Sequence, residues 1–212
     1  MESYLAHAAT VFMGFAAIMN PIANTPIFIG LTSDDDAATK RTVARNSVLL
    51  TFGIIVVFCA AGRLIFEMFG ITLPAFRITG GVLVFLIGFH MLQGESSSVH
   101  RPSEEDQRQS KDAELSVAIS PLAMPILAGP GTIATAMNFS ASGDMLHLAI
   151  TVTTFFVLCL VTYFSFLYGD RLVHYIGRSA INAITRVMGL ILAVIGTQMV
   201  IGGVQGALSA PH

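Results

Sequence analysis

Long apolar segments separated by short polar stretches dominate the chain. A membrane-spanning α-helix needs about 20 consecutive, mostly apolar residues, and six segments meet this requirement. In chain order they cover residues 5–31, 46–69, 73–92, 115–139, 146–168 and 181–204. The pattern therefore predicts an all-α membrane protein with six transmembrane helices.

Two of these segments contain residues that interrupt helices. The first holds Asn20-Pro21 and Pro26, and the fourth holds Pro121, Pro125 and Gly129-Pro130-Gly131. Proline removes a backbone donor, and an unsatisfied backbone group in hydrocarbon costs several kcal/mol. Such breaks are tolerated where they line a polar cavity or are buried in protein. We expect helices 1 and 4 to be broken around a cavity; the alternative is that the prolines only kink them.

The residues around the two breaks suit a small zwitterion. A helix that restarts after a break presents free N–H groups and a positive dipole end to a carboxylate, and the helix that ends there offers carbonyl groups to an ammonium group. Neutral side chains near the breaks add hydrogen-bonding groups. The candidate substrate-binding residues are Asn20, Pro21, Asn24, Thr25, Pro26, Ser120, Pro121, Pro125, Gly129, Pro130, Gly131 and Thr132.

The two halves of the chain resemble each other. The run Asn20-Pro21-Ile22-Ala23 matches Ser120-Pro121-Leu122-Ala123, and a further proline follows each run. In the third and sixth segments, Ala75, Gly81, Gly88 and Met91 match Ala183, Gly189, Gly196 and Met199 at a constant shift of 108 residues. Each half holds three predicted helices, so the second half enters the membrane inverted. Inverted repeats of this kind build many secondary transporters; a chance likeness of glycine-rich apolar segments is the alternative.

Charge placement predicts the topology. Of the 11 basic residues, nine fall near the loops of one side and only Arg63 and Arg77 on the other. Cytoplasmic loops carry the excess of Lys and Arg, so both termini are expected on the non-cytoplasmic side. The chain then divides into a first three-helix repeat (1–92), a polar cytoplasmic linker (93–114) and a second, inverted repeat (115–212).

Composition narrows the function classes. The chain is 54% hydrophobic and 11% charged, against roughly 25% charged residues in a typical soluble domain. With a net charge of −2 and no basic tract, nucleic-acid binding is not expected. The sequence has no HExxH, CxxC or GxxxxGK[ST] motif and no catalytic set within the spans. We therefore expect no enzyme activity, no metal site and no cofactor.

Ionisable residues in or near the spans are candidates for gating or coupling because charge inside a membrane is costly. Arg63 and Glu67 lie four residues apart and can pair across one helical turn. Arg77 and Arg186 occupy nearly related places in the two halves, and His90 lies near the end of the third span. The alternative for each is an interfacial anchor. No acid lies centrally in a span, so the sequence identifies no proton carrier.

Several motifs resemble the MarC family of bacterial inner-membrane proteins. They are Asn20-Pro21 with the run 26–32, Phe69-Gly70-Ile71 with Pro74 and Arg77-Ile78, Pro121-Leu122-Ala123-Met124-Pro125 with Ala128-Gly129-Pro130-Gly131-Thr132-Ile133-Ala134, and Ile184-Thr185-Arg186-Val187-Met188-Gly189. The resemblance covers nearly the whole chain. It implies a six-span, multi-pass protein of the inner (plasma) membrane, related to the exporter superfamily that includes LysE.

The same resemblance implies proton-coupled transport of small neutral amino acids such as glycine and alanine, with export as a candidate direction. A member of this fold that exports another small polar metabolite, or a non-transporting intramembrane protein, is the alternative. A channel is less suited to the sequence, because a channel would need a repeated charged ring or carbonyl filter. The sequence leaves the substrate, the direction of transport and the oligomeric state open.

Overall fold

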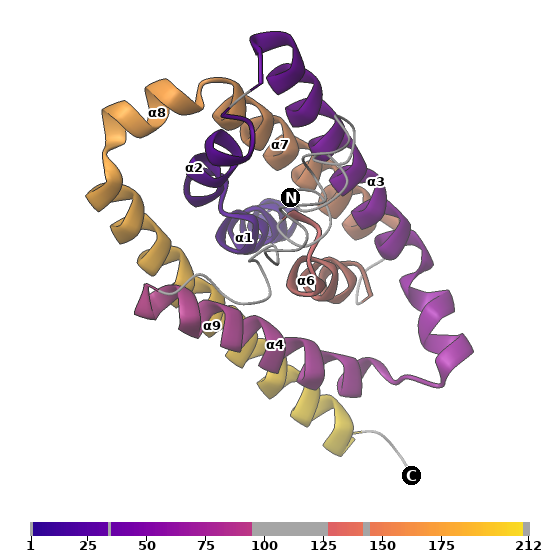
Figure 1. The fold of residues 1–212 in the computed structure, drawn as a ribbon. Coiled ribbons are helices and arrows are strands. Elements are labelled where there is room, and N and C mark those ends of the chain that lie inside the picture. The colour runs from indigo at the N-terminus through magenta and orange to yellow at the C-terminus, as the bar shows by residue number, and fades with distance from the viewer. Residues whose placement is uncertain (1, 34, 95–126, 142–144, 210–212) are drawn as a thin grey trace.

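The computed structural model describes residues 2–33, 35–94, 127–141 and 145–209; these ranges consist of helices joined by short turns and contain no strand (Figure 1). The helices are α1 (Glu2–Met19), α2 (Pro21–Leu31), α3 (Ala37–Phe69), α4 (Leu73–Gln93), α6 (Pro130–Ala141), α7 (Met145–Leu167), α8 (Gly169–Ile176) and α9 (Arg178–Ser209). Residues 95–114 of the linker and residues 115–126 of the fourth predicted span lie outside the described residues.

Five stretches in the described ranges are long and apolar enough to cross a membrane. They are Tyr4–Leu31, Ala37–Gly62, Leu73–Gln93, Met145–Leu167 and Arg178–Ser209. Each coincides with a predicted segment, so the prediction of an all-α membrane protein is confirmed for this part of the chain. At about 1.5 Å per residue, the 12 residues of α6 are too short to cross a core of about 30 Å alone.

Two helices extend beyond what the apolar pattern predicts. α3 begins at Ala37 rather than at residue 46, because Asp36 caps it: the Asp36 carboxylate accepts a hydrogen bond from the Thr39 N–H at 2.7 Å. Hydrogen bonds from the Thr39 side chain and backbone hold the pKa of Asp36 below its usual value. α8 was not predicted; its eight residues, which include Asp170 and Arg171, directly follow α7.

α1 is the central helix of the bundle, and Figure 1 shows it nearly end-on with the other helices around it. It packs against α6, α7 and α9. Val11, Phe15 and Met19 have no exposed surface. On one side, α1 shares a hydrophobic core with α3, α6 and α7; on the other, a second core joins it to α4 and α9. From Gly14 to Met19 no residue of α1 is exposed, as expected at the centre of a bundle.

α4 and α9 form a tight antiparallel pair through glycines. A Cβ built on Gly81 would lie 2.6 Å from the Gly196 carbonyl oxygen, and one built on Gly88 would lie 2.6 Å from the Gly189 oxygen. The order of these contacts along the two helices is opposite, so the helices run antiparallel. Small residues let membrane helices approach this closely.

Each of these contacts between α4 and α9 has a counterpart. It is found by adding 108 to the number of the α4 residue and subtracting 108 from the number of the α9 residue. The shift turns Gly81 into Gly189 and Gly196 into Gly88, so the Gly81–Gly196 contact becomes the Gly88–Gly189 contact. A Cβ on Gly81 would also lie 2.9 Å from the Cβ of Met199, and one on Gly189 would lie 2.8 Å from the Cβ of Met91. These two contacts are related by the same shift. The pair is therefore self-complementary, as an isologous interface is.

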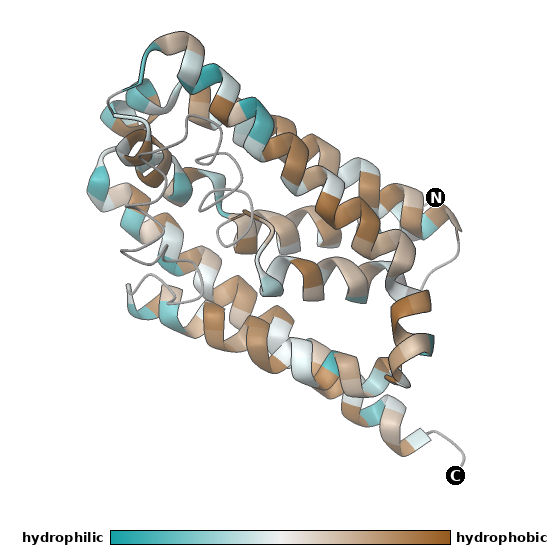
Figure 2. Ribbon diagram, turned by 45° about the vertical axis from the view of Figure 1, so that its right-hand side comes forward, coloured by the Kyte–Doolittle hydropathy of each residue, from teal (hydrophilic) through white to brown (hydrophobic). Residues whose placement is uncertain are grey.

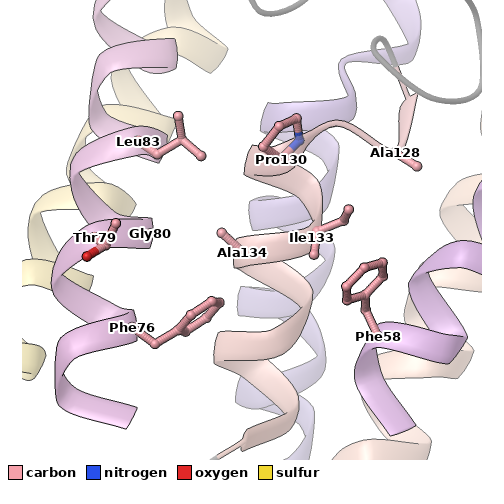
Figure 3. A pocket seen from close by; sticks show the side chains of 9 residues that line it. All are labelled: Phe58, Phe76, Thr79, Gly80, Leu83, Ala128, Pro130, Ile133 and Ala134. Atoms are coloured by element: carbon pink, nitrogen blue, oxygen red, sulfur yellow. The ribbon is translucent and has the colours of Figure 1, made fainter. Parts of the chain in front are cut away.

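The bundle has one apolar middle and two distinct ends (Figure 2). α1 begins and α9 ends at the same end of the bundle, and hydrophilic segments that include the start of α3 gather at the opposite end. α3 and α4 are consecutive, yet α6 packs against both of them and lies between them (Figure 3). The first turn of α6 is thereby held in the interior.

The glycine contacts predict a position-dependent effect on stability. Gly196→Ala places a Cβ 2.4 Å from the Phe85 backbone nitrogen, and overpacking of this kind costs about 1–3 kcal/mol. Gly202→Ala is the matched control on the same helix, since its Cβ meets nothing within 4 Å. Thermal unfolding of the purified protein in detergent should show a lower midpoint for Gly196→Ala and no loss for Gly202→Ala. Equal midpoints for the two variants would contradict the close pairing.

Candidate functional site

The first predicted break lies at a single residue, Asn20. α1 ends at Met19, α2 begins at Pro21, and Asn20 between them has φ 34° and ψ 71°, in the left-handed region. It is the one non-glycine residue with positive φ in the described ranges. Asn occupies this region more readily than most residues. The bend is buried, because Asn20 is 4% exposed.

Side chains at the break replace part of the backbone hydrogen bonding that Pro21 removes. The Asn20 Oδ1 accepts a bond from the Ala23 N–H at 3.2 Å and caps α2. The Asn24 Nδ2 donates to the Met19 carbonyl at 2.7 Å and so satisfies the end of α1. The Thr25 hydroxyl donates to the Pro21 carbonyl at 2.8 Å. These bonds keep both helix ends stable inside an apolar bundle.

α2 is fixed beyond the break by aromatic packing. The rings of Phe28 on α2 and Phe166 on α7 stack with centroids 4.5 Å apart and an interplanar angle of 1°. On the α1 side of the break, the Thr162 hydroxyl of α7 lies 3.9 Å from the Met19 sulfur. α7 therefore contacts the chain on both sides of Asn20.

The N-terminus of α6 lies beside the end of α1. A Cβ built on Gly131 would lie 2.6 Å from the Cδ1 atoms of both Ile18 and Ile87. Gly131 therefore lets the first turn of α6 pack directly on α1, two residues before the break. The Ile133 N–H bonds to the Gly129 carbonyl at 3.0 Å, and the earlier N–H groups of the turn, those of Gly131 and Thr132, have no partner within the helix.

Three polar side-chain atoms in this region are buried and have no hydrogen-bond partner in the described part of the chain. They are the Asn20 Nδ2, the Thr132 Oγ1 and the Thr135 Oγ1. Thr132 and Thr135 have no exposed surface and lie one turn apart on α6. A buried unsatisfied group costs about 1–3 kcal/mol, and each one in a native structure calls for an explanation. A polar ligand between the break and the first turn of α6 would supply partners for the Asn20 Nδ2 and the Thr132 Oγ1.

A cavity of about 480 Å³ opens between α3, α4 and α6, on another face of the same α6 turn (Figure 3). It is lined by Phe58, Phe76, Thr79, Gly80, Leu83, Ala128, Pro130, Ile133 and Ala134. Thr79 supplies the one side-chain hydroxyl of this lining, and none of the three unpartnered atoms belongs to it. The cavity therefore lacks groups to hold the charges of a zwitterion.

The structure places the predicted binding residues unequally. Asn20, Pro21, Asn24 and Thr25 are buried at the first break, and Gly129, Gly131 and Thr132 are buried at the start of α6. Pro26 and Pro130 are exposed. Ser120, Pro121 and Pro125 lie outside the described residues, so the course of the chain just before α6 stays a prediction.

The predicted gating residues lie away from the break. The Arg77 Nε donates to the Asn138 Oδ1 of α6 at 3.0 Å, and the His90 Nδ1 lies 2.8 Å from the Leu86 carbonyl oxygen. The Arg186 guanidinium lies beside Gly94, the residue that caps the C-terminus of α4, where a cation is favoured by the helix dipole. The side chain of Arg63 falls outside the description, so its pairing with the exposed Glu67 stays a prediction.

Thr135 and Thr162 were missed by the sequence reasoning. Thr135 follows the predicted Thr132 by three residues, the spacing of neighbours on a helix surface, so a search along α6 for further hydroxyl groups would have found it. Thr162 lies in the middle of an apolar segment, and no local signal relates it to Met19.

The whole chain matches known membrane proteins. The profile of the MarC family, described as integral membrane proteins, matches residues 5–208. A Bacillus subtilis protein named UPF0056 membrane protein YvbG is 36% identical over 97% of this chain and 96% of its own. A UPF0056 membrane protein of Pyrococcus horikoshii is 36% identical (93% and 94% covered), and the Escherichia coli UPF0056 inner membrane protein MarC is 30% identical (92% of each chain). No solved structure matches the chain.

The unpartnered hydroxyl groups predict that two threonine-to-valine substitutions will affect the free energy of unfolding differently. Thr135→Val removes a hydroxyl that has no partner in the described part of the chain, so the free energy of unfolding should stay equal or rise. Thr25→Val removes the bond to Pro21 and should lower it by about 1 kcal/mol. Denaturant unfolding in detergent measures both. If Thr135→Val destabilises as much as Thr25→Val, the Thr135 hydroxyl has a partner within the protein.

Proposed function

As the chain belongs to the MarC family of integral membrane proteins, we propose that it is a secondary transporter of small neutral amino acids of the glycine and alanine type. The observation that carries the proposal is the buried break at Asn20, where polar atoms without partners in the described ranges face the interior of an apolar bundle. A fold that only anchors a protein in lipid has no need of such groups. A transporter needs them to replace the hydration of its substrate.

The chemistry of the break fits both charges of an amino acid. The N–H groups of Gly131 and Thr132, which have no partner within α6, and the positive dipole end of this helix suit the carboxylate. The carbonyl group of Ala17 suits the ammonium group, since Pro21, four residues later, offers no N–H to it. Asn20 and Thr132 add neutral hydrogen-bonding groups. No charged side chain is required, which favours a substrate with no net charge.

We place this site within a six-helix arrangement of two inverted three-helix repeats. The support is the α4–α9 pair, in which the 108-residue shift maps one set of glycine contacts onto the other. An antiparallel pair with contacts matched in this way has a pseudo-two-fold axis perpendicular to its helices. If the helices cross the membrane, that axis lies in its plane. Inverted repeats related in this way give two equivalent conformations that open to opposite sides.

The direction and energy source follow as further parts of the proposal. The positive-inside bias favours both termini on the non-cytoplasmic side of the plasma membrane, and the Escherichia coli relative is named an inner membrane protein. With no nucleotide-binding motif in the sequence, a proton gradient is the proposed driving force and export the proposed direction. Export of another small polar metabolite by the same site is the second candidate.

Uptake of labelled alanine by proteoliposomes, with and without a pH gradient, tests the proposal. Thr132→Val and Asn20→Gly each remove a hydrogen-bonding group from the site, and glycine keeps the left-handed backbone that position 20 requires. We expect each variant to lower uptake about 5- to 10-fold, the effect of losing roughly 1 kcal/mol. Thr197→Val is the control, because its exposed hydroxyl bonds within α9.

The outcomes separate the candidates. Uptake of glycine and alanine that falls in the two site variants and not in Thr197→Val supports the proposal. Uptake of a different small solute with the same variant pattern favours the second candidate. Folded protein that carries no neutral amino acid, in either direction and at any gradient, would falsify the amino acid assignment.

A further inference from the structure

Thr135 on α6 carries a buried hydroxyl group that neither the fold nor the substrate contacts at the break explain. The side chain has no exposed surface, and its Oγ1 has no hydrogen-bond partner in the described part of the chain. A substrate at the break supplies partners for the Asn20 Nδ2 and the Thr132 Oγ1, which belong to the break itself and to the first turn of α6. Thr135 lies one turn further along the helix, so its hydroxyl needs an explanation of its own.

The other buried threonines show how a threonine hydroxyl is normally satisfied in this bundle. Seven threonines are buried in the described ranges. All except Thr132 and Thr135 donate to the carbonyl oxygen four residues earlier, at 2.8–2.9 Å, which is the usual bond for a threonine within a helix. The corresponding acceptor for Thr135 is the carbonyl of Gly131, in the same helix. Because the Thr135 Oγ1 does not bond to this carbonyl, its hydroxyl group is directed elsewhere.

Thr135 lies on the face of α6 that packs against α1. Four residues before it, a Cβ built on Gly131 would lie 2.6 Å from the Ile18 Cδ1 of α1. Four residues after it, the Phe139 ring lies 3.0 Å from the position of a Cβ on Gly14 of α1. Residues four apart in a helix share one face. The side chain of Thr135 is therefore at the interface with residues 14–18 of α1, between these two contacts.

The same stretch of α1 holds an acceptor that lacks its usual donor. The Ala17 carbonyl would bond to the N–H group of residue 21, which is a proline. Neither α6 nor residues 14–19 of α1 contain an ionisable side chain. A positive group at this interface is therefore bound by neutral oxygen atoms of these segments, and a hydroxyl oxygen such as that of Thr135 accepts hydrogen bonds from an ammonium group.

The two threonines of α6 offer different chemistry to a ligand. Thr132 is in the first turn, where its own N–H group has no partner within the helix and the positive dipole end favours an anion. From Ile133 onward the helix supplies acceptors for the N–H groups, beginning with the bond to the Gly129 carbonyl at 3.0 Å. At Thr135 the hydroxyl is thus the group left to contact a ligand. A ligand with its negative group at Thr132 and its positive group at Thr135 matches both positions.

We propose that Thr135 binds the ammonium group of the substrate while the first turn of α6 binds its carboxylate, so that the site selects α-amino acids. This assignment rests on the proposed function and names the residue that gives it specificity. Residues three apart in a helix have Cβ atoms about 5–6 Å apart, and hydrogen bonds to charged groups are about 2.7–2.9 Å long. Two ligand groups held between such neighbours must themselves be close, as they are when one carbon atom separates them. β-Alanine has two carbon atoms there and fits less well.

Ligand binding to the purified protein in detergent tests the two threonines separately. A ligand that binds the folded state raises the midpoint of thermal unfolding, and the dependence on ligand concentration gives Kd. Alanine carries both charged groups, propionate carries the carboxylate alone, and ethylamine carries the ammonium group alone. Thr135→Val and Thr135→Ala remove the hydroxyl, and Thr135→Ser keeps it. Thr197→Val is the control, because its exposed hydroxyl bonds within α9.

The expected result is a crossed pattern. Thr135→Val and Thr135→Ala should weaken the binding of alanine and of ethylamine about 10-fold, the effect of losing a hydrogen bond to a charged group, and leave propionate unchanged. Thr132→Val should weaken alanine and propionate and leave ethylamine unchanged. Thr135→Ser and Thr197→Val should bind all three ligands as the wild type does. The wild type should bind alanine more tightly than β-alanine.

Two results would overturn the role of Thr135 and leave the proposed function standing. One is wild-type affinity for alanine in both Thr135→Val and Thr135→Ala. The other is an equal loss of alanine and propionate affinity in these variants, because a change in packing would weaken both ligands. Folded wild-type protein whose unfolding midpoint is raised by neither glycine nor alanine would overturn the proposed function together with the role of Thr135.

Discussion

Backbone hydrogen bonding in a hydrocarbon environment is the constraint on which this structure depends. A proline in the middle of an apolar helix removes a donor where water cannot replace it. At the break, Asn20 adopts a left-handed backbone conformation that most amino acids avoid. The Asn24 side chain donates to the Met19 carbonyl at the end of α1, and the Thr25 hydroxyl donates to the Pro21 carbonyl. The break is thus held by specific side chains rather than being a loose bend. Three buried polar side-chain atoms nevertheless have no hydrogen-bond partner in the described part of the chain.

The packing around the break divides the bundle into two parts of different character. α4 and α9 meet through glycine backbones, where a single added methyl group would clash. The contacts between α1 and α7 are made by side chains, such as the rings of Phe15 and Phe155 and the Met19 sulfur next to the Thr162 hydroxyl. Side-chain contacts can separate and reform with smaller changes in the backbone than glycine contacts can. This contrast supports a picture in which α4 and α9 act as a fixed frame and the side-chain contacts between α1 and α7 change.

Much of the fold could be predicted from the sequence, because apolar runs of the right length are visible without any structure. The run 73–92 differs from α4 by one residue at its end. The polar start of α3 and the eight residues of α8 were missed, since a rule that counts apolar residues cannot see them. The 108-residue shift was visible in the sequence as matching glycines, but which glycine contacts which followed only from the antiparallel packing of α4 and α9. At the site, Pro21 indicated the break, whereas the Asn24–Met19 bond and the direction of the Thr135 hydroxyl depend on rotamers and on packing between distant segments.

We propose that the break at Asn20 and the first turn of α6 form a site that opens to each side of the membrane in turn. It is tested most directly by a cysteine at Thr132 in a variant whose buried Cys59 and Cys159 are replaced by alanine. A membrane-impermeant thiol reagent is applied to either face of vesicles, with and without alanine. If the site alternates, the reagent modifies the cysteine at position 132 from both faces, and bound alanine protects this cysteine from modification. If a reference cysteine at the exposed position Ser209, at the end of α9, is modified in folded protein while position 132 is modified from neither face, the alternating site is wrong.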